Sequence, residues 1–176
     1  KEVINSDDDV DRFGFYITRQ LAIAIENDHM LKEMGFDNAR DCLGYRVVIK
    51  NVERLGDHAV RLSQDVLDYK TPIQGKNFDR IQEMSSYAIS VMDDACLALF
   101  KKDYDQAEKS IESANNIQKY EKRILDNLKT SKDEEEIFRI RKIVENVKRV
   151  AEYASDIGEI VLNMNKKNRF KCGGKI

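Results

Sequence analysis

The stretch NVERLGDHAVRLSQDVLDY, residues 51–69, combines the apolar spacing of a long helix with a pair of acids one turn apart. Its apolar and small residues recur in steps of three and four, the pattern of a helix packed in a bundle. We expect Gly56 and Ala59 to face the core and to allow close helix packing. Glu53 and Asp57 fall on a flank outside this core, where two like charges repel unless a counter-charge offsets them. The full seam and its flank are Ile49, Val52, Gly56, Ala59, Ser63 and Val66, with Val48, Leu55, Leu62 and Tyr69.

The same pattern recurs later in the chain. Residues 53–59 (ERLGDHA) align without a gap over residues 148–154 (KRVAEYA), at an offset of 95 residues. The helix that precedes each of these stretches also aligns without a gap, at an offset of 107 residues. The difference between the two offsets comes from a longer connection around residues 27–40 in the first copy. The chain is therefore an internal repeat. The later seam is Ile137, Ile140, Val144, Val147, Ala151, Ala154, Gly158 and Val161, and the upstream pairs are Val10 with Ile117, Phe13 with Tyr120, Ile17 with Ile124 and Leu21 with Leu128.

Five long helices are expected, near residues 6–24, 38–69, 78–101, 103–129 and 131–168. Ser6 with the following acids should cap the first helix, and Ser131 with Glu134 should form a capping box for the last. The sequence thus predicts an all-α fold of tandem three-helix bundles. Residues 1–72 form a first repeat with two helices, residues 76–170 a second repeat with three, and residues 171–176 a flexible tail. The third helix of the first bundle is expected upstream of Lys1 or from another chain.

The composition narrows the classes of function. Lys and Arg number 30 against 32 Asp and Glu, so the net charge of -2 provides no basic surface for nucleic acid. The three cysteines lie far apart without a Cys-x-x-Cys pair, which favours a reducing cytoplasm. No apolar run approaches the about 18–20 residues that a membrane span requires.

The acids of the first repeat are candidate metal ligands. Asp7 and Asp11 lie one turn apart on the first helix, like Glu53 and Asp57 on the second. If the two helices pack antiparallel, the four carboxylates can converge on one outer face, and carboxylates spaced in this way can share a cation. The alternative stays open: acids are also favoured at a helix N-terminus, and Glu53 and Asp57 can pair with basic neighbours on their own helix.

Catalytic chemistry finds little support in the sequence. Glu26-x-x-His29 is half of a di-iron carboxylate motif, but no second copy follows it. The chain has no glycine-rich phosphate loop and no nucleophile–base pair. It contains only two histidines, and histidine is the residue that most often acts as a general acid or base. We therefore predict a protein that is not an enzyme.

Within this repeat, residues 53–59 (ERLGDHA) resemble the hallmark of the PhoU family of phosphate-signalling proteins, and residues 148–159 (KRVAEYASDIGE) resemble its second copy. In that family each of two three-helix bundles ends in a helix bearing Glu-Arg-Ile-Gly/Ala-Asp-His-Ala. The composition is also similar to that of archaeal members. The resemblance implies a cytoplasmic regulatory adaptor that restrains phosphate uptake and starvation signalling. Its implied partners are the transporter's ATPase and a sensor kinase, it allows a homodimer, and it reaches the membrane only through partner proteins.

The resemblance also implies a metal. Family members bind iron or zinc through Glu/Asp-x-x-x-Asp motifs, and the matching positions here are Asp7, Asp11, Glu53 and Asp57. The second copy departs from the motif at Ala114, Gln118 and Lys148, which leaves Glu152 and Asp156 as weaker candidates. Two other functions stay open: an accessory domain of a potassium channel or sodium–phosphate cotransporter, and a carboxylate-bridged metalloenzyme.

Overall fold

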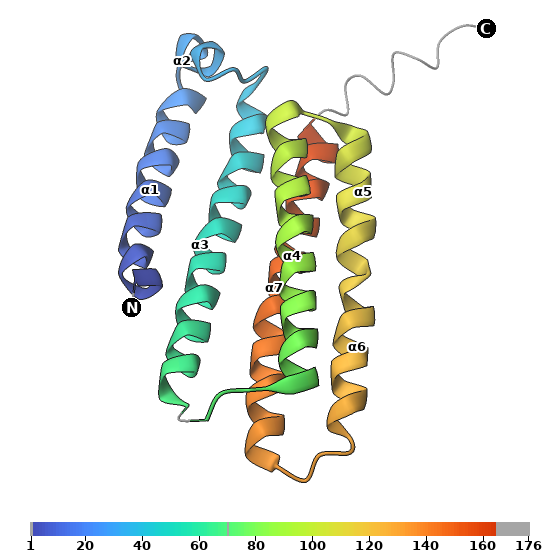
Figure 1. Ribbon diagram of the computed structural model, residues 1–176. Coiled ribbons are helices and arrows are strands. Elements are labelled where there is room, and N and C mark those ends of the chain that lie inside the picture. The colour runs from blue at the N-terminus through green and yellow to red at the C-terminus, as the bar shows by residue number, and fades with distance from the viewer. Residues whose placement is uncertain (1, 70, 165–176) are drawn as a thin grey trace, which may run out of the picture.

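The computed structural model describes residues 2–69 and 71–164, and every regular element within these residues is an α-helix. The long helices lie side by side in an elongated bundle, with one short helix at its end (Figure 1). The predicted all-α fold is confirmed. The elements are α1 (Glu2–Ile25), α2 (Asp28–Glu33), α3 (Ala39–Asp68), α4 (Gly75–Lys101), α5 (Tyr104–Asn115), α6 (Ile117–Leu128) and α7 (Glu134–Met164).

The second repeat is a complete three-helix bundle of α4, α5 with α6, and α7. Helix α4 packs against α7 and against both α5 and α6. The seam predicted for α7 is confirmed, because each of its residues from Ile140 to Val161 is buried in one apolar core. On α4 the buried side chains keep helical spacing, and they are Met84, Ala88, Val91, Ala95, Ala98 and Leu99.

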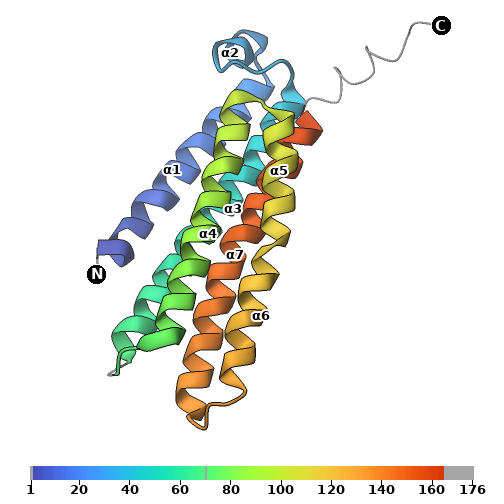
Figure 2. The same ribbon diagram turned by 45° about the vertical axis from the view of Figure 1, so that its right-hand side comes forward.

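The first repeat consists of α1 and α3, joined through α2. Helix α1 packs chiefly against α3 and α2, and it lies at the edge of the molecule in two views (Figures 1 and 2). Its core is smaller and contains Leu21, Ala24, Leu31, Cys42 and Ile49. Helix α3 also packs against α7, so the two repeats are joined through their last helices.

The contact between α3 and α7 has a local two-fold character. His58 and Tyr153 occupy equivalent positions of the repeat, and their rings lie 5.9 Å apart. The two helices also run in opposite directions (Figure 1). Equivalent residues can meet in this way only near an axis that exchanges the two repeats, as in an isologous dimer interface. The repeats are therefore related by an approximate two-fold rotation.

Several predicted helix ends are wrong. Helix α1 begins at Glu2, so Ser6 lies inside it and its hydroxyl donates to the Glu2 carbonyl at 3.0 Å. Helix α7 is capped by Asp133, which accepts the N–H of Glu136 at 3.0 Å; the predicted Ser131 box does not form. Residues 165–168, predicted to continue this helix, and the predicted tail 171–176 lie outside the described residues.

Two further differences concern helix continuity. The helix predicted over residues 103–129 is interrupted at Asn116, where the side chain bonds the Glu112 carbonyl at 3.3 Å. Asparagine competes for backbone hydrogen bonds in this way and weakens a helix interior. The short helix α2 was not predicted. Asn27 caps it by accepting the N–H groups of His29 and Met30.

The predicted burial of the α3 seam is only partly correct. Gly56 is half-buried against α1, whereas Ala59, Val52 and Val66 are exposed. Their counterparts on α7 are buried. The physical reason is that α4 packs against α7, while no helix among the described residues takes the corresponding place on α3.

Candidate functional site

The acids of the first repeat meet where α1 crosses α3. A β-carbon added to Gly56 would lie 3.0 Å from Asp7 Oδ1, so the Asp7 carboxylate rests against the backbone of α3. Partial burial, followed by the charges of Asp11, Asp57 and Asp8, raises the pKa of Asp7. The cluster therefore concentrates negative charge at one end of the α1–α3 pair.

Glu53 does not lie on the solvated flank that the sequence predicted. Its side chain is only 12% exposed, and it forms an ion pair with Lys50 one turn away. A β-carbon on Gly14 would lie 2.6 Å from Glu53 Oε1, so the carboxylate occupies the space that this glycine leaves on α1. Gly14 is the reason why Glu53 turns inward between the helices.

The four predicted ligands are thus divided. Asp7 lies within electrostatic reach of Asp11 and Asp57, but Glu53 is engaged by Lys50. Among residues 2–69 and 71–164, no three or more Asp, Glu, His or Cys side chains are grouped to hold a metal ion. A four-carboxylate site would require Glu53 to leave Lys50.

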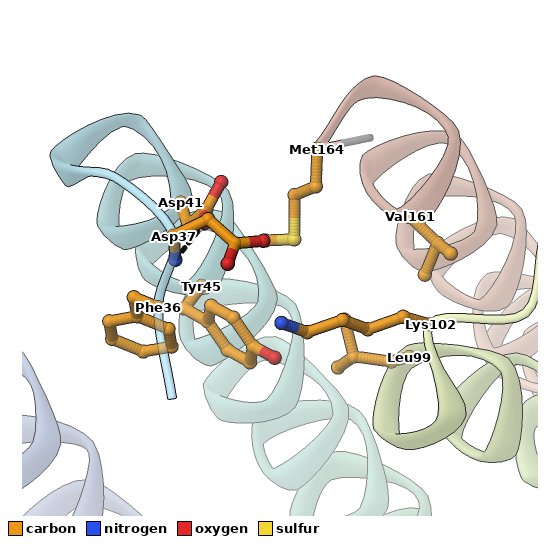
Figure 3. Close-up of a pocket in the computed structure, with 8 residues that line it drawn as sticks. All are labelled: Phe36, Asp37, Asp41, Tyr45, Leu99, Lys102, Val161 and Met164. Carbon is orange, nitrogen blue, oxygen red and sulfur yellow. Dashed lines mark hydrogen bonds between the residues drawn. The ribbon is translucent and has the colours of Figure 1, made fainter. Parts of the chain in front are cut away.

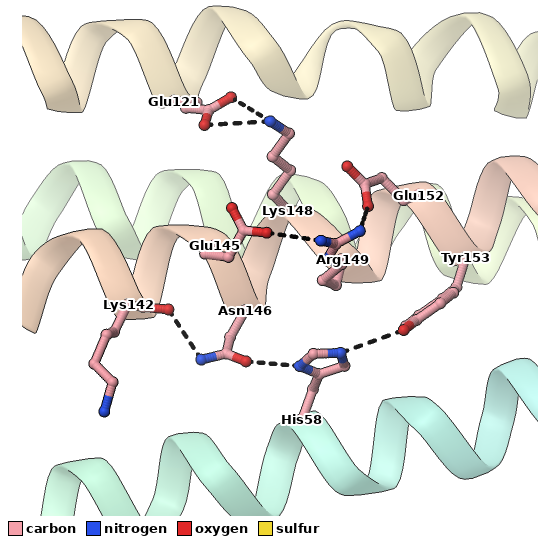
Figure 4. Close-up of polar contacts among 9 residues, drawn as sticks. All are labelled: His58, Glu121, Lys142, Glu145, Asn146, Lys148, Arg149, Glu152 and Tyr153. Atoms are coloured by element: carbon pink, nitrogen blue, oxygen red, sulfur yellow. Dashed lines mark hydrogen bonds and ion pairs between the residues drawn. The ribbon is translucent and has the colours of Figure 1, made fainter.

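The second repeat replaces this arrangement with an ion pair. Lys148 and Glu121 occupy the positions equivalent to Glu53 and Gly14, and Lys148 Nζ lies 3.0 Å from Glu121 Oε2 (Figure 4). The hydrogen bond with Glu121 raises the pKa of Lys148. The first repeat therefore places the Glu53 carboxylate in the space beside Gly14, whereas the second places the opposite charges of Lys148 and Glu121 at the equivalent positions.

The weaker candidates of the second repeat are also engaged in protein contacts. Glu152 pairs with Arg149 at 2.7 Å (Figure 4), and Asp156 accepts a hydrogen bond from Asn51 on α3 at 3.4 Å. Partial burial raises the pKa of Asp156, while the bond from Asn51 and the charge of Arg54 oppose that rise. These two acids consequently belong to separate contacts on α7.

A polar network that the sequence analysis missed joins α3 to α7 (Figure 4). Asn146 Nδ2 donates to the Lys142 carbonyl at 2.9 Å, so its Oδ1 faces His58 and accepts from Nδ1 at 2.7 Å. His58 Nε2 is hydrogen-bonded to the Tyr153 hydroxyl at 3.2 Å. Both ring nitrogens of His58 therefore have a partner, which indicates a structural role at the repeat interface. The equivalence of positions 58 and 153 was the signal that could have revealed it.

A buried carboxylate lies at the other end of α3 (Figure 3). Asp41 is 6% exposed; its Oδ2 accepts the N–H of Asp37 at 3.1 Å, and its Oδ1 has no hydrogen-bond partner. Lys102 closes the same region by donating to the Gly35 carbonyl at 3.1 Å. The cavity between them measures about 10 Å³. That is room for about one water molecule and not for an organic substrate.

The cysteine beside this acid is not an activated nucleophile. Cys42 is buried, and burial together with the charge of Asp41 raises the pKa of its thiol. A catalytic cysteine needs the opposite shift, because the thiolate is the reactive form. Separately, none of the helices in the described part of the chain combines the length and the apolar character required to cross a membrane.

A comparison with models of known protein families identifies the family of this chain. A family model described as the PhoU domain matches residues 1–66 and 81–161, which lie in the first and second repeats. The chain belongs to the PhoU family. Both stretches that carry the repeat signature, residues 53–59 and 148–154, fall inside the segments matched to this family. The PhoU resemblance noted in the sequence is thereby confirmed.

A solved PhoU structure has the same fold. The crystal structure of the phosphate transport system regulatory protein PhoU from Streptococcus pneumoniae aligns with a TM-score of 0.77 and 17% identity, over 94% of this chain and 78% of that one. At this identity the likeness establishes the fold alone. Among curated protein sequences no match is found.

Proposed function

We propose that this protein is a non-enzymatic regulatory adaptor of phosphate transport and phosphate-starvation signalling. The observation that carries the proposal is its membership of the PhoU family over both repeats. The similar Streptococcus pneumoniae protein is described as a regulator of a phosphate transport system. Long helices with exposed aromatic side chains, such as Phe13, Phe15 and Tyr16 on α1, offer extended surfaces for other proteins.

The expected partners are the ATPase of the phosphate transporter and a sensor kinase, both met in the cytoplasm. In this proposal the adaptor contacts the membrane only through such partners. Regulation then takes place through binding alone. An adaptor that binds one conformation of its partner more tightly shifts the partner's conformational equilibrium towards that conformation.

Deletion of the gene in its native organism tests the role directly. We expect faster uptake of radiolabelled phosphate in phosphate-replete medium and expression of starvation genes, both restored by the wild-type gene. In parallel, the purified protein should bind the purified transporter ATPase. Unchanged uptake and an unchanged starvation response in the deletion strain would refute the proposal. If potassium uptake or sodium-dependent phosphate uptake changed instead, the protein would be an accessory domain of those transporters.

We also propose that the acidic cluster binds iron or zinc through Asp7, Asp11 and Asp57, with Glu53 joining once it leaves Lys50. The support is the concentration of like charge around Asp7, which a cation would relieve. Whichever metal binds, the first repeat is the expected location, because Lys148 places a positive charge at the equivalent position of the second.

Elemental analysis of purified protein after incubation with either metal tests this proposal. Glu53→Ala combined with Asp57→Ala should remove the bound metal, because two oxygen ligands disappear. The matched control is Glu152→Ala with Asp156→Ala on α7, which should keep it. Equal metal content in the wild type, the double variant and the control would show that these acids form only an ordinary polar helix surface.

A further inference from the structure

The side of α1 that points away from α3 carries a stripe of exposed residues. Gly14 and Leu21 are buried on the side towards α3, and the far side of α1 lies at the edge of the molecule (Figures 1 and 2). Residues spaced three and four positions apart share one face of a helix. On the far side of α1 the exposed residues with this spacing, which we call the outer stripe, are Asp8, Arg12, Phe15 and Arg19.

The second repeat shows that bundle packing leaves this face open. Phe15 corresponds to Lys122 of α6, and its neighbour Tyr16 corresponds to Arg123. Both basic residues remain exposed although α4 packs against α6 and completes that bundle. In the first repeat the same two positions hold aromatic rings that are 74% and 62% exposed. Adjacent exposed aromatic side chains at an outer position indicate a surface that another molecule covers.

The outer stripe is complementary to a reversed copy of itself. Asp8 and Arg19 lie at equal distances from the midpoint of residues 13 and 14, and so do Arg12 and Phe15. When two identical helices pack antiparallel about that midpoint, Asp8 of each copy faces Arg19 of the other. In the same register Arg12 of each copy faces Phe15 of the other, because a two-fold axis repeats every contact.

Both contacts are favourable in this register. An aspartate opposite an arginine is an ion pair, and a guanidinium over a phenyl ring is a cation–π contact. Arg12 is available for its contact, because its ion pair with Asp9 is long, at 3.7 Å, and fully on the surface, where such pairs contribute little. In a parallel pair each arginine would face its own copy, so repulsion selects the antiparallel arrangement.

We propose that the outer stripe is a homodimer contact, in which α1 packs antiparallel on α1 of a second copy. The contact is isologous and therefore closed, so it predicts dimers and no larger assemblies. One helix from each copy buries less than the about 1,200–2,000 Å² of a typical stable interface. The dimer should therefore be weak and dissociate on dilution. This inference does not depend on the role in phosphate transport.

Analytical ultracentrifugation of the full chain over a range of concentrations tests the proposal. Chelator and reducing agent exclude association through metals or disulfides. We expect the wild type to change from monomer to dimer as its concentration rises, and high salt to favour the monomer. Asp8→Arg and Arg19→Asp should each weaken dimerisation at least about tenfold, because each places like charges opposite one another twice.

Mixing the two variants tests the register itself. In a mixed dimer of Asp8→Arg with Arg19→Asp, both arginines of one chain face aspartates of the other. An equimolar mixture should therefore dimerise again, whereas each variant alone stays monomeric at the same total concentration. A mixture that stays monomeric would overturn the proposed antiparallel contact.

Phe15→Ser should also weaken the dimer, and the matched control is Phe138→Ser, which changes an exposed phenylalanine of α7 and should leave it intact. Circular dichroism verifies that all variants remain folded, as expected for exposed residues. A wild type that stays monomeric at every concentration, or a dimer that Asp8→Arg does not weaken, would contradict the proposal. If the wild type stayed monomeric and Phe15→Ser weakened binding of the purified transporter ATPase, the outer stripe would serve that partner instead of a second copy.

Discussion

Gly158 on α7 is the position where one added methyl group should cost most. A β-carbon there would lie 2.8 Å from Ile111 Cγ1, 3.0 Å from Ser110 Oγ and 3.1 Å from the Ala107 carbonyl oxygen. The Ser110 hydroxyl cannot move aside freely, because it is buried and donates to the same carbonyl at 2.8 Å. Two neighbours are thus held by packing and by a hydrogen bond, and the third belongs to the backbone of α5.

The magnitude of Gly158→Ala is a difference of two effects. Forcing a methyl group into a well-packed core costs about 1–3 kcal/mol, whereas replacing glycine by alanine inside a helix gains about 1 kcal/mol. We expect a net loss of about 1–2 kcal/mol of unfolding free energy, since the Ala107 carbonyl cannot yield without bending α5. For a chain of this size the loss corresponds to a fall in Tm of about 3–6 °C.

Gly56→Ala is the matched control. Gly56 is the counterpart of Ala151, and its nearest neighbours would be Asp7 Oδ1 at 3.0 Å, the end of a flexible side chain, and Val10 Cγ1 at 3.6 Å. Here the gain in helix propensity from glycine to alanine should exceed the steric cost, with a net stabilisation of about 0.5–1 kcal/mol. Urea unfolding followed by far-UV circular dichroism measures both variants in one buffer. If Gly158→Ala were as stable as wild type, or if Gly56→Ala lost as much, the packing argument would be wrong.

Four further substitutions probe the other contacts. Ala151→Leu should lower the urea midpoint by overpacking a fully buried seam position, at a cost of about 1–3 kcal/mol; an unchanged midpoint would contradict its burial. Lys148→Met should cost about 1–2 kcal/mol, because it leaves Glu121 unpaired in a partly buried contact, and Glu121→Gln in the same background should recover part of the loss. Asp7→Asn should stabilise the metal-free protein at pH 7, because a raised pKa means that ionised Asp7 opposes folding. Thermal melts in chelator should show that gain shrinking as the pH falls through the raised folded pKa and vanishing below 3.8, where the folded and unfolded states both bind the proton; a constant gain would refute the electrostatic cause.

The helices themselves were predictable because their signal is local. The seam of α7 repeats over its whole length, and each of its residues from Ile140 to Val161 is buried as expected. Helix ends were less predictable, since several residues compete for each cap. Ser6 lies among acids that fit a helix start equally well, yet the four residues before Ser6 extend the helix back to Glu2. Similarly, Asp133 outcompeted Ser131 for the start of α7.

Burial in the first repeat could not be predicted from the pattern of α3 alone, because it depends on whether another helix covers that pattern. The seam of α3 has the same spacing as that of α7, but Val52 and Val66 are exposed where their counterparts lie under α4. A periodic pattern indicates which face of a helix is suited to packing. It does not state whether another helix covers that face.

The candidate site illustrates the same limit at the level of side chains. The spacing of Glu53 and Asp57 suggested a shared role, whereas the space beside Gly14 draws Glu53 inward and separates the pair. The two repeat offsets contain the correction: they align Gly14 with Glu121 and Glu53 with Lys148, a pair that meets as an ion pair in the second repeat. Two positions that touch in one copy of a repeat should touch in the other. Hence comparing the copies pairwise, and not motif by motif, is what identifies Glu53 as a residue of the α1–α3 contact before any role as a ligand.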